Sequence, residues 1–506
     1  MADTELLQNM FTEMPKAKNF TDSQWIQLTD YNNGSYTTQI QFDTDSLKDD
    51  FVSFHDAFVT IPFQVKPTSG NYTSASLVAM KASLLSLIYG VQVINASNSG
   101  GTLVNDVGVQ FINNLRLCIE KSSDWGNSEA CEIQFAKDMN DTRDPNATLL
   151  QYSTTATSGI TYTFDESKTT FTSTCASTAT GTGSLVLSAG SGISMLNPLQ
   201  SGIGNGINND YYNEGFAKRV MFLQNQSTIV GGAIQCTACI PLALLHDFFN
   251  QLDFPIYNMR WKIILMLASG SVYPPIMVGN GTRQGITTVT GPCTLYYRKL
   301  QLPAEALSNL KNVKQKQIDF ISTDFVTPAY NNSVTTGLQL PISSSTIMPL
   351  RLWSLLYPAG TITAQADADP STTSSGYCSP LCATGQLTNA NVSINNKPYF
   401  EYNYNKSYEF WQALKEQFPG FGQGDTLGSM LNYNDFLSNF RYHVFDISRL
   451  KGDRLKAPNN AVTIQLNCAR SDSNGAMDYI VLVERLSSLV LDFEKSAVRS
   501  IYGTTA

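Results

Sequence analysis

Alternation of apolar and polar residues dominates this chain and predicts many β strands. From Ala57 to Val65 every second residue is apolar, the period of a strand with one buried face. Pro62 within this run indicates an edge strand or a bulge, because proline cannot donate a backbone hydrogen bond. Similar patterns predict further strands at residues 36–42, 111–119, 216–223, 232–239, 257–267, 294–302, 317–325, 347–356, 392–404, 436–446, 461–468 and 477–493. This distribution is typical of a mainly β protein.

A few segments have helical spacing instead. Apolar residues at 77, 80, 84 and 88 share one helix face, and Gly90 follows where a helix would end. Residues 303–316 begin with proline and continue with helix-forming residues, which predicts a helical connector between two halves. A second helix is predicted at residues 407–418, within SYEFWQALKEQF.

The stretch IPLALLHDFFNQLDFPIYNMRWKIILML, residues 240–267, changes period halfway along. Pro241 suits a first helical turn, and the next residues place Leu and Phe on one arc of a helix, with His246 and Asp247 on the opposite polar arc. After Pro255 the period falls to two, and from Ile263 both faces are apolar. We therefore expect an amphipathic helix followed by a strand that another layer, or a neighbouring copy of the protein, covers on its outer face.

The two halves of the chain repeat one plan. Each contains a long stretch rich in Ser, Thr and Gly, at residues 153–208 and 359–391, which we interpret as insertion loops, the first with small strands of its own. Two pairs of weakly similar segments, called echoes below, occur in the same order in both halves. FINNLRLCIEKSSDW echoes SINNKPYFEYNYNKSYEFW, and TLYYRKLQL echoes DYIVLVERLSSL. These echoes predict two copies of one β domain.

Composition and charge narrow the classes of function. Charged residues make up only 15% of the 506 residues, and the formal net charge is −8. The first 30 residues are slightly acidic, so the basic arm expected of a protein that binds nucleic acid extensively is missing. The start of the chain lacks a secretory signal pattern, and no apolar run is long enough for a membrane span. The nine cysteines favour buried free thiols in a reducing compartment.

Catalytic patterns are missing from the sequence. The three histidines, His55, His246 and His443, lie in separate segments, and no GxSxG, HExxH or papain-like cysteine pattern accompanies them. A structural role is the favoured interpretation for each. We therefore predict no catalytic residue, no cofactor and no enzymatic activity.

Candidate metal ligands are equally weak. Cys236 and Cys239 form one CxxC in a predicted strand, where alternation places them on opposite faces, whereas a structural zinc site needs two converging pairs. Cys378 and Cys382 in the second polar loop could form a small disulfide in an oxidising environment, but two free thiols are favoured. The aspartates of residues 367–369 could recruit calcium, but the EF-hand spacing is absent and a solvated loop is favoured. We predict no metal site.

Three stretches carry a resemblance to a known family: DYNNGSYTTQIQFDT (residues 30–44), DAFVTIPFQV (56–65) and IPLALLHDFFNQLDFPIYNMRWKI (240–263). With them, the sequence resembles the double jelly-roll major capsid proteins, in particular those of polinton-like viruses and virophages. The resemblance implies two tandem eight-stranded jelly rolls with long insertion loops and a few short helices. It also implies that the helix of residues 240–252 lies between the F and G strands of the first roll.

The resemblance divides the chain into an arm, two rolls, a connector and a tail. The expected bounds are an arm at 1–30, a first roll at 31–302, a helical connector at 303–316, a second roll at 317–493 and a tail at 494–506. The insertions would form an outward crown, and the arm and tail would lie near the shell floor.

The resemblance implies a major capsid protein in the virion, made in the host cell without a secretory signal. Its subunits would form homotrimeric, pseudo-hexameric capsomers that build an icosahedral shell around a DNA genome. Neighbouring capsomers, penton proteins and minor capsid proteins would be its partners, with little direct contact to nucleic acid. Two alternatives remain open: a β-sandwich protein that binds or acts on carbohydrate, and a trimeric spike or fibre protein. Scattered carboxylates argue against the first, and the lack of short repeats argues against the second.

Overall fold

The structure of the chain is a computed structural model. It describes residues 22–34, 38–44, 51–74, 76–96, 101–138, 160–163, 170–175, 184–186, 214–268, 273–278, 283–301, 313–328, 336–360, 362, 381–418, 428–448, 461–470 and 477–502. Asp367, Asp369 and Cys378 lie outside these ranges.

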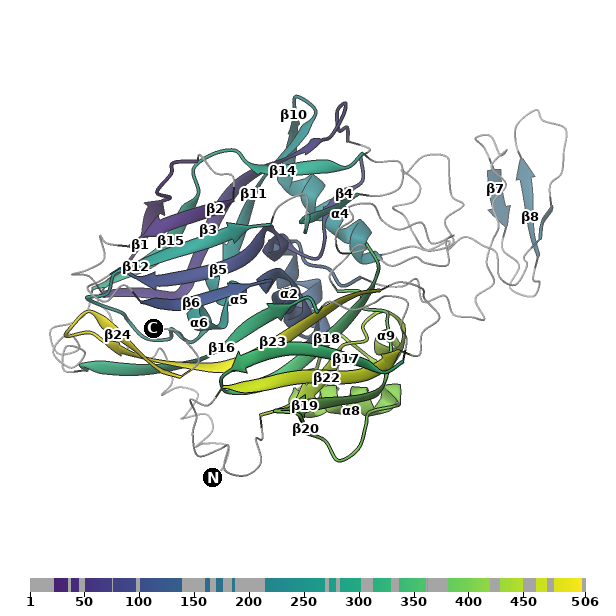
Figure 1. Cartoon of the computed structure of the whole chain (residues 1–506). Helices are drawn as coiled ribbons and strands as arrows, with labels where there is room; N and C mark the ends of the chain where they lie inside the picture. The colour runs from purple at the N-terminus through teal and green to yellow at the C-terminus, as the bar shows by residue number, and fades with distance from the viewer. Residues whose placement is uncertain are drawn as a thin grey trace, which may run out of the picture.

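The N-terminal half forms a β sandwich (Figure 1). One sheet has the strand order β1-β15-β3-β11-β10, with β14 also paired to β3, and the other has the order β2-β12-β5-β6. The strands of these two sheets are β1 (Asp22–Thr29), β2 (Gln39–Asp43), β3 (Phe51–Pro67), β5 (Ile88–Asn95), β6 (Thr102–Val107), β10 (Ser227–Val230), β11 (Ala233–Pro241), β12 (Trp261–Leu267), β14 (Gly285–Val289) and β15 (Thr294–Gln301).

The C-terminal half forms a second β sandwich, drawn in green and yellow in Figure 1. Its sheets have the orders β16-β23-β18-β21, with β24 paired to β23, and β17-β22-β19-β20. The strands are β16 (Gln315–Val326), β17 (Leu338–Thr346), β18 (Pro349–Pro358), β19 (Leu387–Ile394), β20 (Lys397–Pro398), β21 (His443–Asp446), β22 (Val462–Arg470), β23 (Met477–Asp492) and β24 (Ala497–Tyr502).

Both sandwiches have the topology of a jelly roll. If the eight main strands of each half are lettered B to I in chain order, both halves have one sheet in the order B-I-D-G and one in the order C-H-E-F. The B strands are β1 and β16, the G strands are β11 and β21, and the I strands are β15 and β23. The predicted double jelly roll and the predicted duplication are therefore confirmed in strand order.

The limits of the two sandwiches differ from the predicted ones at both ends. β1 lies within the predicted arm and pairs with β15 along its whole length. β24 lies within the predicted tail and pairs with β23. β16 begins at Gln315, so the last two residues of the predicted connector are strand, and residues 302–312 lie outside the described ranges.

Two segments predicted as strands are helices. Residues 111–119 lie in α2 (Val109–Glu120), and residues 216–223 lie in α4 (Glu214–Gln226). α2 is buried on nearly all sides, so its apolar positions fit either period and only tertiary packing decides between them. Conversely, the helix predicted from residue 77 to 88 is wrong. That segment forms β4 (Val78–Met80), the 3-10 turn η2 (Leu84–Leu87) and the start of β5.

Pro62 is not on an edge strand. It lies in β3, whose neighbours in the sheet are β15 and β11. On one side of β3, the pairs with β15 end at Thr60 and the pairs with β14 begin at Phe63. Pro62 occupies the gap between these two ladders, where its missing backbone N–H is not needed.

The stretch from residue 240 to 267 forms two short helices and a strand. α5 (Leu242–Leu245) and α6 (Asp247–Asn250) are separated by His246, which has an extended backbone, and β12 follows. These helices connect strands G and H, so the predicted position between F and G is wrong. The helix directly after strand F of the first roll is α2.

The remaining elements are short or lie beside the sandwiches. Residues 436–446, predicted as one strand, divide into α9 (Tyr433–Ser438) and β21, whereas the predicted helix at 407–418 is confirmed as α8 (Ser407–Gln417). The other short elements are α3 (Ser123–Asn127), η3 (Glu129–Ile133) and β13 (Ile276–Val278), which pairs with β4. Within the first insertion, the structure describes the small sheet β7 (Ile160–Thr163), β8 (Thr170–Cys175) and β9 (Ser184–Val186).

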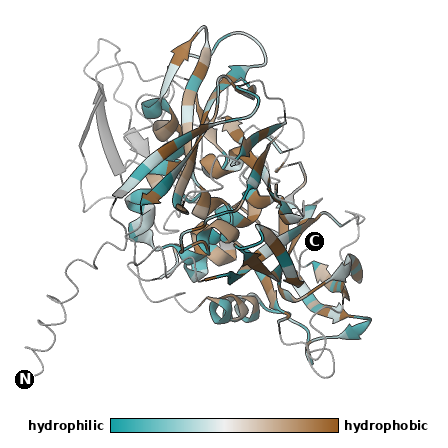
Figure 2. Ribbon diagram, turned by 90° about the vertical axis from the view of Figure 1, so that its left-hand side faces the viewer, coloured by the Kyte–Doolittle hydropathy of each residue, from teal (hydrophilic) through white to brown (hydrophobic). Residues whose placement is uncertain are grey.

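One apolar core runs through both sandwiches. Buried side chains from both halves belong to a single contiguous cluster, and hydrophobic segments run through the strands and central helices of both halves in Figure 2. The helices α2, α5 and α6 lie between the two sandwiches in Figure 1. Within the stretch of residues 240–267, Phe248 of α6 packs against Phe320 of β16, with 5.3 Å between ring centroids, so the second half of the same chain covers part of this stretch. No helix in the described ranges has both the length and the apolar character needed to cross a membrane.

Candidate functional site: the interface between the two jelly rolls

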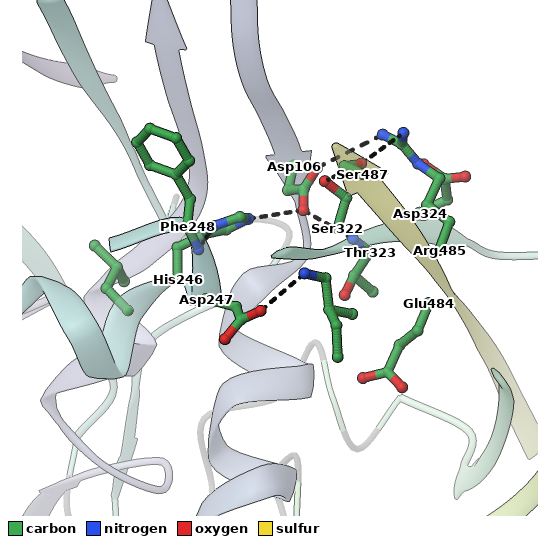
Figure 3. Close-up of polar contacts among 12 residues, drawn as sticks. Asp106, His246, Asp247, Phe248, Ser322, Thr323, Asp324, Glu484, Arg485 and Ser487 are labelled. Atoms are coloured by element: carbon green, nitrogen blue, oxygen red, sulfur yellow. Dashed lines mark hydrogen bonds and ion pairs between the residues drawn. The ribbon is translucent and has the colours of Figure 1, made fainter. Parts of the chain in front are cut away.

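Asp106 is the centre of a buried polar contact between the rolls (Figure 3). It lies in β6, and its Oδ2 accepts hydrogen bonds from His246 Nε2 and from the backbone N–H of Thr323 in β16, both at 2.8 Å. Its Oδ1 lies 4.0 Å from the guanidinium of Arg485 in β23. One carboxylate therefore connects two elements of the first roll with two strands of the second.

His246 is held in a single tautomer by this contact. Its Nδ1 accepts the backbone N–H of Phe248 at 3.1 Å, so in the neutral ring the proton is on Nε2 and is donated to Asp106. The ring also caps α6 through the Phe248 bond. His246 was predicted to lie on the polar arc of a helix. Its side chain is 5% exposed and contacts Phe320 of the second roll, with 6.1 Å between ring centroids.

Carboxylates of the first roll cover part of the edge strand β16 of the second roll. Asp247 Oδ2 accepts the backbone N–H of Ile321 at 2.8 Å, two residues from the N–H that Asp106 accepts. Both N–H groups point away from β23, at the edge of the sheet. An uncovered edge is a template for pairing with other chains. The two aspartates satisfy this part of the edge and fix the position of the rolls.

Glu484 forms a buried ionic contact across the interface. It lies in β23 with a fully buried side chain. Its Oε1 is 2.5 Å from Arg116 Nη2 in α2, and its Oε2 is 2.5 Å from Arg351 Nε in β18. Burial alone would raise the pKa of Glu484, but the two guanidinium groups hold it below its usual value. The carboxylate is therefore a charged link between the rolls.

A second buried ion pair joins the segments on either side of residues 139–213, which include the predicted first insertion at 153–208. Asp138 precedes residues 139–213, and Arg219 in α4 follows them. Their side chains are fully buried and 2.5 Å apart. Arg219 also donates to the backbone oxygen of Met80 at 3.0 Å, and the thiol of Cys382, from the second half, lies 3.4 Å from Asp138. The ion pair thus anchors the insertion to the body of the protein.

Close backbone approach adds to the polar contacts. Gly108, just before α2, has a φ of +70°, and a Cβ added there would overlap the ring of Phe325 in β16. The Phe325 ring stacks on Phe111 with 5.3 Å between ring centroids. Glycine is therefore required both by the left-handed backbone and by the contact with the second roll.

We expect Gly108→Ala to lower the free energy of unfolding by about 2–3 kcal/mol, of which roughly 1–2 kcal/mol is left-handed backbone strain and the rest is overlap with Phe325. Urea unfolding followed by fluorescence measures the loss. Gly337→Ala is a matched control, because Gly337 has a φ of +66° with no atom near its added Cβ. Equal losses in the two variants would show that the Phe325 contact contributes nothing.

Those candidate residues from the sequence that the structure describes do not converge on a reactive centre. Within the part of the chain that the structure describes, no three His, Cys, Asp or Glu side chains gather as metal ligands. Cys236 is buried and Cys239 exposed, as the alternation predicted, and both are free thiols. Cys382 is also a buried free thiol. The absence of catalytic and cofactor residues stays a prediction.

Comparisons with known proteins agree with this architecture at the level of the fold. No protein-family model and no curated protein sequence matches the chain. Among solved structures, a chain in the 3.5 Å cryo-EM structure of the Sputnik virophage matches with a TM-score of 0.55 and 10% sequence identity, covering 97% of this chain and 90% of its own length. Because the match spans both halves, the fold is the double jelly roll.

Two further solved structures are similar at lower TM-scores. The mavirus major capsid protein matches with a TM-score of 0.45 and 10% identity, covering 98% of this chain and 94% of its own. The Faustovirus major capsid protein matches with a TM-score of 0.44 and 10% identity, covering 94% of this chain and 92% of its own. The fold conclusion rests on the Sputnik match and on the strand order.

Proposed function

We propose that this chain is a viral major capsid protein that assembles with copies of itself into a shell. The observation that carries the proposal is the joining of two jelly rolls by buried contacts, with Asp106 and Glu484 at their centre. Such an interface makes the two rolls one rigid block, which suits a shell subunit. The fold shared with a chain of the Sputnik virophage supports the same role.

In its finer form, the proposal is a homotrimer that presents six upright jelly rolls as a pseudo-hexameric capsomer of an icosahedral shell around DNA. The residues 153–208 and 359–391 would form its outward crown, and penton and minor capsid proteins would complete the shell. The net charge of −8 supports little direct contact with the genome. The protein would act in the virion as a structural component without enzymatic activity.

An exposed cluster of aromatic residues on the first roll supports self-association. Trp25 in β1 is 46% exposed, and its ring lies 5.5 Å from Phe58, which in turn lies 4.7 Å from Tyr296. Arg298 lies over the Trp25 ring, 4.6 Å from its centroid. Tryptophan and arginine are enriched where protein interfaces gain most of their binding energy.

Native mass spectrometry of the purified chain tests the proposal, and negative-stain imaging tests it independently. We expect a mass three times 55.5 kDa and particles with six-fold outlines. A protein that remains a monomer at all concentrations, and never forms shells, contradicts it. Cleavage of a glycan by the purified protein would also overturn it in favour of a carbohydrate-active sandwich.

We expect Trp25→Ala to weaken trimer formation about tenfold or more, because truncating a tryptophan at an interface hot spot costs about 2 kcal/mol or more. Sedimentation velocity over a concentration series measures the shift. Tyr408→Ala is the matched control, because Tyr408 is also an exposed aromatic residue, 57% exposed, but lies on α8 of the second roll. An unchanged trimer in Trp25→Ala would exclude this face from the subunit contact.

A further inference from the structure

A cleft of about 700 Å³ opens on the second roll. It lies between the segment that follows β20, the C-terminal part of α8 and the end of β21. Its principal lining residues are Tyr399, Phe400, Glu401, Tyr402, Glu416 and Asp446. None of these residues takes part in the contacts between the two rolls described above.

The aromatic wall of the cleft is preformed. The Tyr402 ring lies 5.4 Å from the ring of Tyr404, which stacks on Phe410 of α8, also at 5.4 Å between centroids. Phe400 meets Tyr404 at a right angle with 5.3 Å between centroids. Tyr404 is buried, whereas Tyr402 is 61% exposed. The exposed ring of Tyr402 therefore faces solvent and is supported by the packed rings beneath it.

The charge of the cleft is one-sided. Glu401, Glu416 and Asp446 contribute carboxylates, and none of the lining residues is basic. Asp446 is held in place by the backbone N–H and hydroxyl of Ser448, at 2.9 and 2.6 Å. Glu416 lies in the last turn of α8, where the helix dipole disfavours a negative charge. A carboxylate at this position therefore does not stabilise α8. Binding of a cationic ligand would account for it instead.

The shape and the charge together select the ligand. Among the described residues, no three carboxylate, imidazole or thiol groups gather as metal ligands, so the three acids are spread along the wall rather than around one ion. A neutral ligand would take the exposed carboxylate of Glu416 out of water without supplying a counter-charge. A lysine or arginine side chain satisfies both the carboxylates and the aromatic faces, to which cations are attracted.

We propose that this cleft binds a peptide segment of a different protein, in which Lys or Arg side chains stand next to apolar side chains. The acidic lining of the cleft and the net charge of −8 on this chain make a basic partner complementary to it. The proposal goes beyond assembly of the shell and does not rest on it.

Fluorescence anisotropy with the full-length protein tests this binding. The probe is a fluorescein-labelled peptide of alternating Lys and Leu, and its matched counterparts carry Glu or Ser in place of Lys. We expect the Lys peptide alone to bind, and its affinity to fall as salt screens the charges. Equal binding of the Glu or Ser peptide would overturn the proposal.

Variants locate the binding site. We expect Tyr402→Ala and Glu416→Gln each to weaken binding of the Lys peptide about tenfold, which corresponds to about 1.4 kcal/mol. Tyr408→Ala and Glu129→Gln are the controls, because both residues are exposed and neither lines the cleft. Unchanged binding in the cleft variants, or an equal loss in the controls, would overturn the proposal. Circular dichroism of each variant verifies that it is folded.

Two other occupants are outcomes of the same experiment. If chitohexaose binds and Tyr402→Ala abolishes its binding while the Lys peptide does not compete, the cleft is a carbohydrate site. If Glu416→Gln instead reduces self-association in sedimentation velocity, the occupant is a second copy of this chain. Either result overturns the proposal of a basic partner, while a failure to form trimers bears only on the proposed capsid role.

Discussion

Replacing Glu484 by Ala is expected to lower the free energy of unfolding by about 3–5 kcal/mol, the usual cost of removing one partner from a buried ionic contact. The change leaves Arg116 and Arg351 without their shared counter-ion, and the side chains of both are less than a fifth exposed. Because Arg116 belongs to the first roll and Glu484 to the second, the contact between the rolls is weakened as well. Urea unfolding followed by tryptophan fluorescence measures both effects.

The matched control for Glu484→Ala is Glu494→Ala. Glu494 pairs with Lys314 at 3.3 Å, and both side chains are more than 60% exposed, so its loss should change stability by no more than about 0.5 kcal/mol. If loss of the contact allows the two rolls to unfold independently, the urea transition of Glu484→Ala will show two separate steps. A loss below about 1 kcal/mol in Glu484→Ala would show that the ionic contact does not hold the rolls together.

The strands were predictable where one face of a strand is buried and the other is exposed. β3 and β22 alternate between buried and partly exposed residues over most of their lengths, and period-two alternation identifies such strands directly. α2 gives no such signal, because 10 of its 12 residues are buried. Its burial comes from packing between two sandwiches, and a local pattern does not contain that information.

The internal echoes were predictive for one pair and misleading for the other. TLYYRKLQL and DYIVLVERLSSL lie in β15 and β23, the two I strands, so this pair marks equivalent positions. FINNLRLCIE forms α2, whereas SINNKP forms the end of β19, a turn and β20. Asn395 and Asn396 have positive φ angles in that turn. The same sequence, Ile-Asn-Asn, therefore lies in a helix in one roll and in a hairpin in the other.

The interface residues were largely beyond the reach of local patterns. Arg116 and Glu484 are 368 positions apart, and Asp106 and Thr323 are 217 apart. One signal was available: Glu484 and Arg485 directly follow the apolar run 480–483 in β23, and a charge inside a strand buried on both faces must be paired. That signal indicates that a partner exists, but only the fold identifies it as Arg116.

Acidification is expected to destabilise the protein through His443. This histidine lies in β21, 1% exposed. Its Nε2 accepts the backbone N–H of Leu387 at 3.3 Å, and its Nδ1 lies 3.3 Å from the backbone oxygen of Ser354, to which the neutral ring donates. A second proton would have to enter at Nε2, against the N–H of Leu387. Burial, the main cause, lowers the pKa of His443 from 6.5 to about 3.

The sign of the pH effect follows from which state binds the proton. Below pH 6.5 the unfolded chain protonates His443, while the folded chain keeps the ring neutral until about pH 3, so stability falls as pH falls through this window. The expected loss from this residue is about 2 kcal/mol between pH 7 and pH 5, approaching about 1.4 kcal/mol per pH unit. The lowered pKa of Glu484 acts in the same direction, but at lower pH, as its carboxylate becomes protonated.

His443→Gln separates these contributions, because glutamine does not titrate. We expect the variant to be less stable than the natural protein at pH 7, since one or both backbone contacts are lost, but to lose about 2 kcal/mol less between pH 7 and pH 5. Urea midpoints at both pH values give the difference, and His55→Gln is the control because His55 is exposed on β3. If His443→Gln retains the pH dependence of the natural protein, acid destabilisation originates elsewhere, and the buried ring of His443 does not take part in it.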